Sequence, residues 1–176
     1  MDTVRVMTAT SEACPAGARY NATERAGVEP NQHAWQPPDS QVIKINVDAS
    51  LSPRSSYVAA VGRDSTGQVL LISTQPVNSA KTLMAEPEAI LLGLRLVVDK
   101  AGECCVVASD ANVIVQCINN ASSPIPWRAG HIINECRHIL QSHAHLGLKF
   151  DKRSTNVAAH KIDHRCFSID LYSNWV

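Results

Sequence analysis

The sequence predicts an α/β domain in which a mixed sheet of five strands is flanked by helices. Three strand-like segments come first, and helical and strand-like segments follow them in alternation. A run of hairpin-connected strands followed by crossover connections is typical of a mixed sheet with helices packed on it. The length of 176 residues suits one domain with some spare chain, and a hydrophobic content of 45% is ordinary for a globular protein.

Three segments with the two-residue periodicity of strands open the predicted domain. They span residues 41–47, 57–63 and 68–74. In the first of them, Ile43, Ile45 and Val47 alternate with polar residues, so we expect one face of this strand to be buried. The stretch Asp64-Ser65-Thr66-Gly67 has turn chemistry, and the second and third strands are therefore expected to form a hairpin.

The second half of the chain alternates helical and strand-like patterns. Residues 83–101 are rich in helix formers and end before Gly102, a suitable C-cap. One stripe of this helix is formed by Glu86, Ala89, Ile90, Gly93 and Val97. The remaining expected elements are a buried strand at 104–109, a short helix at 111–119, a long helix at 127–143, a strand at 148–150 and a helix from about Asn156.

Residues 1–34 are predicted to be a disordered leader, and residues 35–176 to be the folded domain. The leader is small, polar and aperiodic, and Trp35 with the two prolines after it ends the flexible part. No apolar stretch approaches the roughly 20 residues of a membrane span, and the N-terminus lacks a signal-peptide pattern. The six cysteines follow no disulfide or metal spacing. We therefore expect an intracellular protein of the nucleus or cytoplasm that is not secreted and has no membrane partner.

Charge composition gives no strong indication of a partner. The chain carries 16 basic and 16 acidic residues, and its formal net charge is zero. Such a balance does not demand a nucleic-acid partner, and it does not exclude a local basic patch.

Acidic residues follow two of the predicted strands. Asp48 and Asp110 each end one, and the long helix carries Glu86 near its start. If these strands are parallel neighbours, their aspartates share one sheet edge, and the helix between them can bring Glu86 over it. Three adjacent carboxylates stay ionised only where cations neutralise them, and oxygen ligands favour Mg²⁺ or Mn²⁺. Two such ions about 3.5–4 Å apart can clamp the attacking and leaving oxygens of a phosphodiester. The alternative for Asp48, taken alone, is a turn-forming residue.

An ordered set of motifs extends this pattern along most of the chain. The set comprises W-x-P-P, VIKINVDAS, RDSTGQVL, MAEPEAILLGL, VVASDANVIVQCI and RSTNVAAHKI. It resembles the ribonuclease H domain found in plants, of the kind related to non-LTR retroelement reverse transcriptases, over residues 35 to about 172. The resemblance implies the ribonuclease H fold, a five-stranded mixed sheet flanked by helices whose first three strands are antiparallel.

The resemblance also implies an active site and an activity. Asp48, Glu86 and Asp110 match the family's three metal-binding acids, which hold two Mg²⁺ ions, with Mn²⁺ as a substitute. The fourth acidic position falls on His160, which would relay a proton near the attacking water. The implied activity is hydrolysis of the RNA strand of an RNA–DNA hybrid by a metal-dependent endonuclease, which we expect to be a monomer.

Three features depart from the family pattern. Ala49 stands where a glycine is usual, and residues 82–84 lack the asparagines that contact the substrate's 2′-hydroxyl in relatives. Pro87 predicts that the helix starts at about Ala85, which would leave Glu86 at its very end. These departures favour a second hypothesis, a non-catalytic nucleic-acid-binding remnant. A third is an exonuclease or integrase-type relative, since those proteins share the fold and the three acids.

Some nearby residues have competing interpretations. Glu88 is the rival of Glu86, but it points about 200° away around the helix. Trp127 could stack on a base, although a packing role is favoured, and Arg153 could meet a phosphate or be only a surface cation. The histidines at 131, 138, 143 and 145 fit no zinc spacing.

Overall fold

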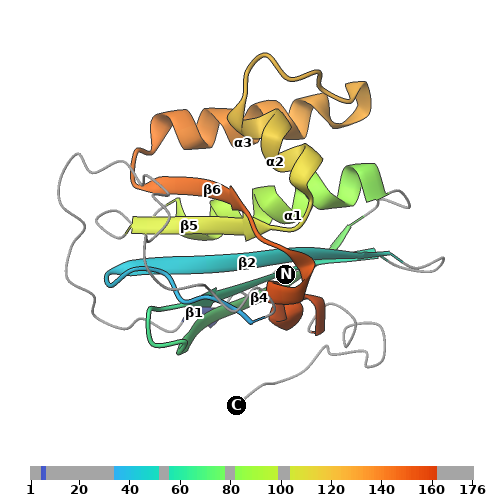
Figure 1. Cartoon of the computed structure of the whole chain (residues 1–176). Helices are drawn as coiled ribbons and strands as arrows, with labels where there is room; N and C mark the ends of the chain where they lie inside the picture. The colour runs from blue at the N-terminus through green and yellow to red at the C-terminus, as the bar shows by residue number, and fades with distance from the viewer. Residues whose placement is uncertain (1–4, 7–33, 52–55, 78–81, 99–103, 162–176) are drawn as a thin grey trace.

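The computed structural model describes residues 5–6, 34–51, 56–77, 82–98 and 104–161 (Figure 1). Its strands are β1 (Arg5–Val6), β2 (Val42–Leu51), β3 (Ser56–Arg63), β4 (Val69–Val77), β5 (Cys104–Ser109) and β6 (Leu146–Phe150). Its helices are α1 (Thr82–Val97), α2 (Asn112–Asn119) and α3 (Gly130–Ser142), with short 3₁₀ helices η1 (Trp127–Ala129) and η2 (Arg153–Thr155). Residues 157–161 are also helical.

The strands form one mixed sheet in the order β1-β4-β3-β2-β5-β6. Strands β2, β3 and β4 are antiparallel neighbours, whereas β5 and β6 run parallel to β2. The predicted five-stranded mixed sheet with three antiparallel strands first is therefore confirmed. The short edge strand β1, which pairs antiparallel with β4, was not predicted.

Helix α1 covers one face of the sheet, against β2, β3 and β5, and α3 packs against α1, α2 and β6 (Figure 1). The buried core between them includes Ile45, Val47, Ile90 and Leu94. The approach of α1 to β2 is close, because a Cβ added at Gly93 would lie only 2.7 Å from Val47 Cγ1. The face of β2 that carries Ile45 and Val47 was predicted to be buried, and it is the face against which α1 packs.

Two expectations about segment ends need correction. The first strand does not stop at Val47 but continues to Leu51, because β3 pairs with it over this whole length. The expected long helix at 127–143 is divided into η1 and α3. The predicted leader lies outside the described residues except for β1 and Ala34, so its boundary stays a prediction.

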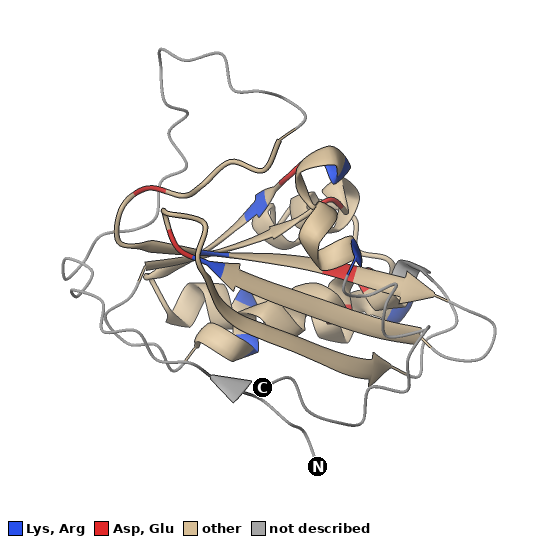
Figure 2. Cartoon of the chain, turned by 90° about the horizontal axis from the view of Figure 1, so that it is seen from below, with Lys and Arg blue, Asp and Glu red and all other residues tan. Residues whose placement is uncertain are grey.

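Among the described cysteines, Cys105, Cys117 and Cys136 are buried free thiols. Cys104 is disulfide-bonded, which the lack of a cysteine pattern did not lead us to expect. No helix in the described ranges has the length and apolar character to cross a membrane. Figure 2 shows acidic and basic residues interspersed over the described ribbon, in keeping with the zero net charge.

Candidate metal centre

The register of two parallel strands brings Asp48 and Asp110 together. The pairing of β2 with β5 ends at Asn46 opposite Ala108. Asp48 and Asp110 each follow by two residues, so they lie at the same level on chains about 4.8 Å apart. Asp110 directly follows β5, as predicted, but Asp48 lies inside β2 and is paired with Ala59. Asp48 is therefore not a turn residue.

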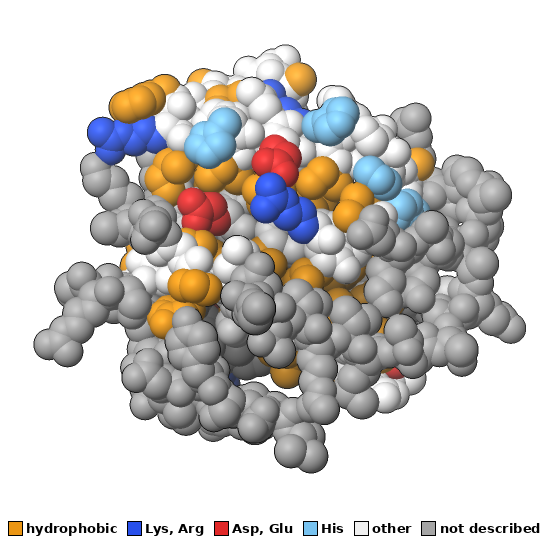
Figure 3. Space-filling model, turned by 180° about the vertical axis from the view of Figure 1, so that it is seen from behind, with side chains coloured by type: hydrophobic (Ala, Val, Ile, Leu, Met, Phe, Trp, Pro, Cys, Tyr) orange, Lys and Arg blue, Asp and Glu red, His pale blue; other side chains and the backbone are white. Residues whose placement is uncertain are grey.

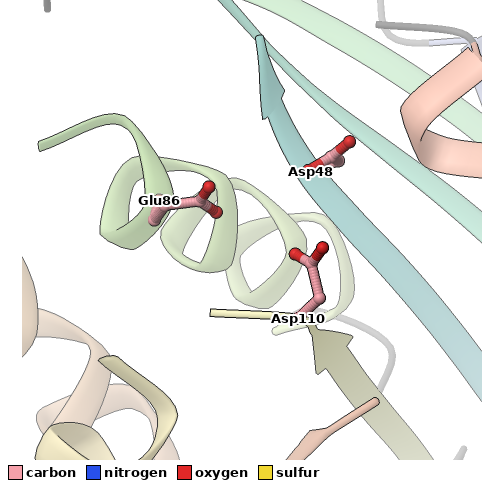
Figure 4. A group of neighbouring side chains, drawn as sticks. All are labelled: Asp48, Glu86 and Asp110. Carbon is pink, nitrogen blue, oxygen red and sulfur yellow. The ribbon is translucent and has the colours of Figure 1, made fainter. Parts of the chain in front are cut away.

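Glu86 reaches the same place from α1. It precedes Gly93 by seven residues, or two helical turns, and so shares the stripe that meets β2. One carboxylate oxygen from each of Asp48, Glu86 and Asp110 lies within 4.8 Å of the other two. Figure 4 shows the carboxylates of Glu86 and Asp110 directed into the space between α1, β2 and the end of β5, with Asp48 beside them.

The expected effect of Pro87 is wrong. Helix α1 begins at Thr82, not at about Ala85, and Pro87 lies inside it. A proline there removes one backbone hydrogen bond, but burial of Ala85 before it and of Ala89 after it supports the helix on both sides of that gap. Glu86 is therefore more than one turn into α1, and its carboxylate is not displaced from the other two.

Electrostatics at the site favour a bound cation. Burial raises the pKa of Asp110 above its usual value, and the negative charge of Asp48 raises it further, while Arg153 and His160 act in the opposite direction. Asp48 itself is only 5% exposed. Two neighbouring carboxylates with little solvent repel each other, and a divalent ion relieves that repulsion. An all-oxygen set of ligands fits Mg²⁺ or Mn²⁺.

His160 contacts this group directly. Its Nδ1 lies 2.8 Å from Oδ2 of Asp48, and its side chain is 32% exposed, so solvent reaches the ring. The turn that carries it is anchored by the fully buried Asn156, whose Nδ2 donates a 2.7 Å hydrogen bond to the carbonyl of Val47. The sequence marked Asn156 only as the approximate start of the last helix, not as an anchor of that helix on β2. Its signal was its position four residues, about one helical turn, before His160.

The structure also places the three residues for which the sequence left two interpretations, Glu88, Trp127 and Arg153. Glu88 is outside the carboxylate group, and burial raises its pKa while the charge of His131 lowers it. The packing role expected for Trp127 is wrong, because this ring is 83% exposed, with the Arg128 guanidinium 4.8 Å from its centre. Arg153 is an exposed cation, as expected, and its charge acts on Asp110.

The histidines form no second metal centre in the part of the chain that is described. Figure 3 shows histidine side chains spread over the face seen from behind. The rings of His143 and His145 meet edge to face with centres 5.8 Å apart. Within the described ranges, the only group with ligand-like spacing is Asp48, Glu86 and Asp110.

The order of the strands and the helices that flank them are those of the ribonuclease H-like fold. The chain belongs to the reverse transcriptase-like family, whose model matches residues 46–166. No curated protein sequence matches the chain.

Solved structures of low sequence identity share the fold. RNase H1 from the halophilic archaeon Halobacterium salinarum NRC-1 aligns with a TM-score of 0.64 at 14% identity, over 72% of this chain and 98% of that one. LC11-RNase H1, isolated from compost by a metagenomic approach, gives 0.65 at 19% identity, over 73% and 96%. The same enzyme in complex with an RNA/DNA hybrid gives 0.61 at 20% identity, over 70% and 94%.

Proposed function

We propose that this protein is a divalent-metal-dependent endonuclease that hydrolyses the RNA strand of RNA–DNA hybrids. The observation that carries the proposal is the convergence of Asp48, Glu86 and Asp110, whose ligand oxygens lie within 4.8 Å of one another. Membership of the reverse transcriptase-like family supports it. The hybrid bound by LC11-RNase H1, which shares the fold, supports the choice of substrate.

In this proposal the three carboxylates hold two Mg²⁺ ions, which Mn²⁺ can replace. Bound divalent ions supply charge neutralisation at the attacking and leaving oxygens of a phosphodiester. Asp48 receives a hydrogen bond from His160, which orients the carboxylate. Because its ring is partly exposed, His160 can also exchange a proton with a water beside that carboxylate.

The partner in this proposal is a nucleic acid, bound by a monomer inside the cell, in the nucleus or cytoplasm. The exposed Arg153, whose charge acts on Asp110, could meet a substrate phosphate. The exposed Trp127 could stack on a base. The sequence motifs favour an origin in a plant retroelement.

The hypothesis of a non-catalytic remnant loses part of its support. Pro87 does not displace Glu86, and Ala49 lies inside β2, where an extended residue needs no glycine. The lack of asparagines at residues 82–84 remains a difference from relatives that cleave hybrids.

The test is cleavage of a hybrid duplex with a labelled RNA strand in Mg²⁺, in Mn²⁺ and in excess chelator. Two variants on one helix make a matched pair: Glu86→Gln removes a proposed metal ligand, and Glu88→Gln removes a carboxylate outside the group. We expect cleavage that requires metal, is lost in Glu86→Gln and is kept in Glu88→Gln. Hybrid binding without cleavage in either metal would overturn the proposal in favour of the remnant.

A further inference from the structure

The face of β2 that carries Asp48 is polar and yet buried. Lys44, Asn46 and Asp48 occupy every second position of β2 and so share this face, where they are 1%, 0% and 5% exposed. Ile45 and Val47 point to the other face, toward α1. A lysine and an asparagine with so little solvent must be satisfied by specific partners, because an unpaired buried polar group is costly.

The segment before β2 supplies the first set of partners. The indole Nε1 of Trp35 donates to Asn46 Oδ1 over 2.9 Å, and the amine of Lys44 donates to the carbonyl of Gln36 over 3.1 Å. Arg63 on β3 also donates to Asn46 Oδ1, and its guanidinium lies 3.8 Å from the centre of the Trp35 ring. These contacts fix the chain at residues 35–36 onto the sheet.

The segment after β6 supplies the second set of partners. Asp151 forms an ion pair of 2.5 Å with Lys44. Further along, Asn156 donates to the carbonyl of Val47, and His160 meets Asp48. The three contacts follow β2 in order, so this segment lies along the strand and ends at the carboxylate group.

We propose that Lys44 and Asp151 are positioning residues, which dock the segment after β6 onto β2 and so place His160 against Asp48. This inference rests on the proposed function, because it assigns a role to a contact within that site. Lys44 connects the segment before β2 to the segment after β6, since its amine binds both the Gln36 carbonyl and the Asp151 carboxylate.

The physical reason is that a buried ion pair tolerates little displacement. Once Lys44 has lost its water, its charge is stabilised only by partners at hydrogen-bond distance. Burial lowers the pKa of Lys44 to about 8, although Asp151 opposes this. The pair therefore holds Asp151 in one place, and Asp151 lies only nine residues before His160. Groups that orient a metal ligand from behind typically affect metal affinity or activity by about 10–100-fold.

The first arm of the test measures amide hydrogen exchange in the metal-free protein. The variant is Asp151→Asn, which keeps the shape of the side chain and removes its charge. Glu135→Gln is the matched control, because it breaks another ion pair between elements, that of Arg95 and Glu135, away from the site. We expect faster exchange at residues 156–161 in Asp151→Asn alone. Unchanged exchange there would overturn the inference.

The second arm is a double-mutant cycle on hybrid cleavage. If Asp151 acts through His160, Asp151→Asn lowers kcat about 10-fold with KM unchanged, and causes no further loss in the His160→Ala background. An equal loss in both backgrounds would show a general structural effect and overturn the inference. Lys44→Met, which keeps the apolar stem, replaces Asp151→Asn in both arms if that variant does not fold.

The two arms separate this inference from the proposed function. If the wild type cleaves no hybrid in either metal, the proposed function fails, and the exchange arm still decides whether Lys44 and Asp151 dock the segment. If the wild type cleaves but both arms show no effect of Asp151→Asn, the inference alone fails.

Discussion

The two faces of β2 differ sharply in how they are buried. The face with Ile45 and Val47 is covered by α1 through apolar contacts, and Gly93 lets the helix approach closely. The face with Lys44, Asn46 and Asp48 is covered by the segments before β2 and after β6 through hydrogen bonds and an ion pair. Both faces have almost no solvent exposure.

The two faces therefore make different contributions to the protein. Apolar contacts are tolerant of small shifts, and they supply most of the free energy of folding. Polar contacts are directional, so they fix positions closely, but they supply less net stability because each replaces hydrogen bonds to water. Because β2 carries both kinds of contact, the backbone of Asp48 is fixed by the apolar packing against α1, and its carboxylate is oriented by His160. Changes on the polar face should therefore affect activity more than stability, and changes on the apolar face should affect stability more than activity.

The largest expected effect is that of Asp110→Asn on cleavage. The substitution keeps the shape and removes one of the three negative charges that would hold the metal, so hybrid cleavage should be abolished. The thermal unfolding temperature should not fall, because burial and the charge of Asp48 already disfavour ionised Asp110. Initial rates of cleavage and thermal unfolding curves of Asp110→Asn measure the two quantities. Unchanged cleavage would refute the metal mechanism. A lower unfolding temperature would show that Asp110 stabilises the fold.

A smaller loss is expected for His160→Ala. A group that relays a proton typically contributes about 10²–10⁴-fold to the rate, and the metal ligands remain in place. The measurement is kcat in Mg²⁺ beside that of Lys161→Ala, a control on the neighbouring exposed residue. Equal rates for the two variants would remove His160 from the site's chemistry.

The spacing of apolar residues in the sequence predicts most of the apolar core between α1 and β2. The period of two in residues 43–47 and the stripe through Ala89, Ile90 and Val97 identify the surfaces that α1 and β2 bury together. The meeting of Asp48 and Asp110 was also predictable, because the two strands are parallel neighbours, although Asp48 lies inside β2 and does not follow it. The start of α1 was not, because the local preference of Pro87 loses to packing of the residues around it.

The polar face could not be predicted in the same way. Lys44 and Asn46 look like the solvent side of a half-buried strand, and only segments far along the chain bury them. Asp151 lies more than 100 residues from Lys44 in the sequence, and no local pattern links the two. Their contact depends on where β6 leaves the sheet, which is a property of the whole fold.

On the apolar face, the sharpest change is Gly93→Ala. The new Cβ would lie 2.7 Å from Val47 Cγ1, so α1 or β2 must shift, and overpacking of this kind typically costs about 1–3 kcal/mol. Urea unfolding measures the loss. Gly130→Ala is the matched control, because its Cβ would meet only Ile125 at 3.9 Å in a helical position that favours alanine. Equal stability of the two variants would contradict the close approach of α1.

The smallest and most specific effect concerns the pH dependence contributed by Lys44. Burial lowers its folded-state pKa to about 8 from the usual 10.5, so between these values the unfolded chain binds more protons than the folded one. Stability contributed by this group therefore rises with pH through that window. The wild type should gain roughly 1–3 kcal/mol relative to Lys44→Met between pH 8 and pH 10.5.

The comparison with Lys44→Met cancels the other groups that titrate in the same range, provided that unfolding stays reversible. Urea unfolding of both proteins at several pH values measures the difference. A difference that stays constant across the window would mean that Lys44 keeps its proton in the folded protein as readily as in water. The polar face of β2 would then be wetter than its contacts indicate, and the ion pair with Asp151 would be a weaker constraint on the segment that carries His160.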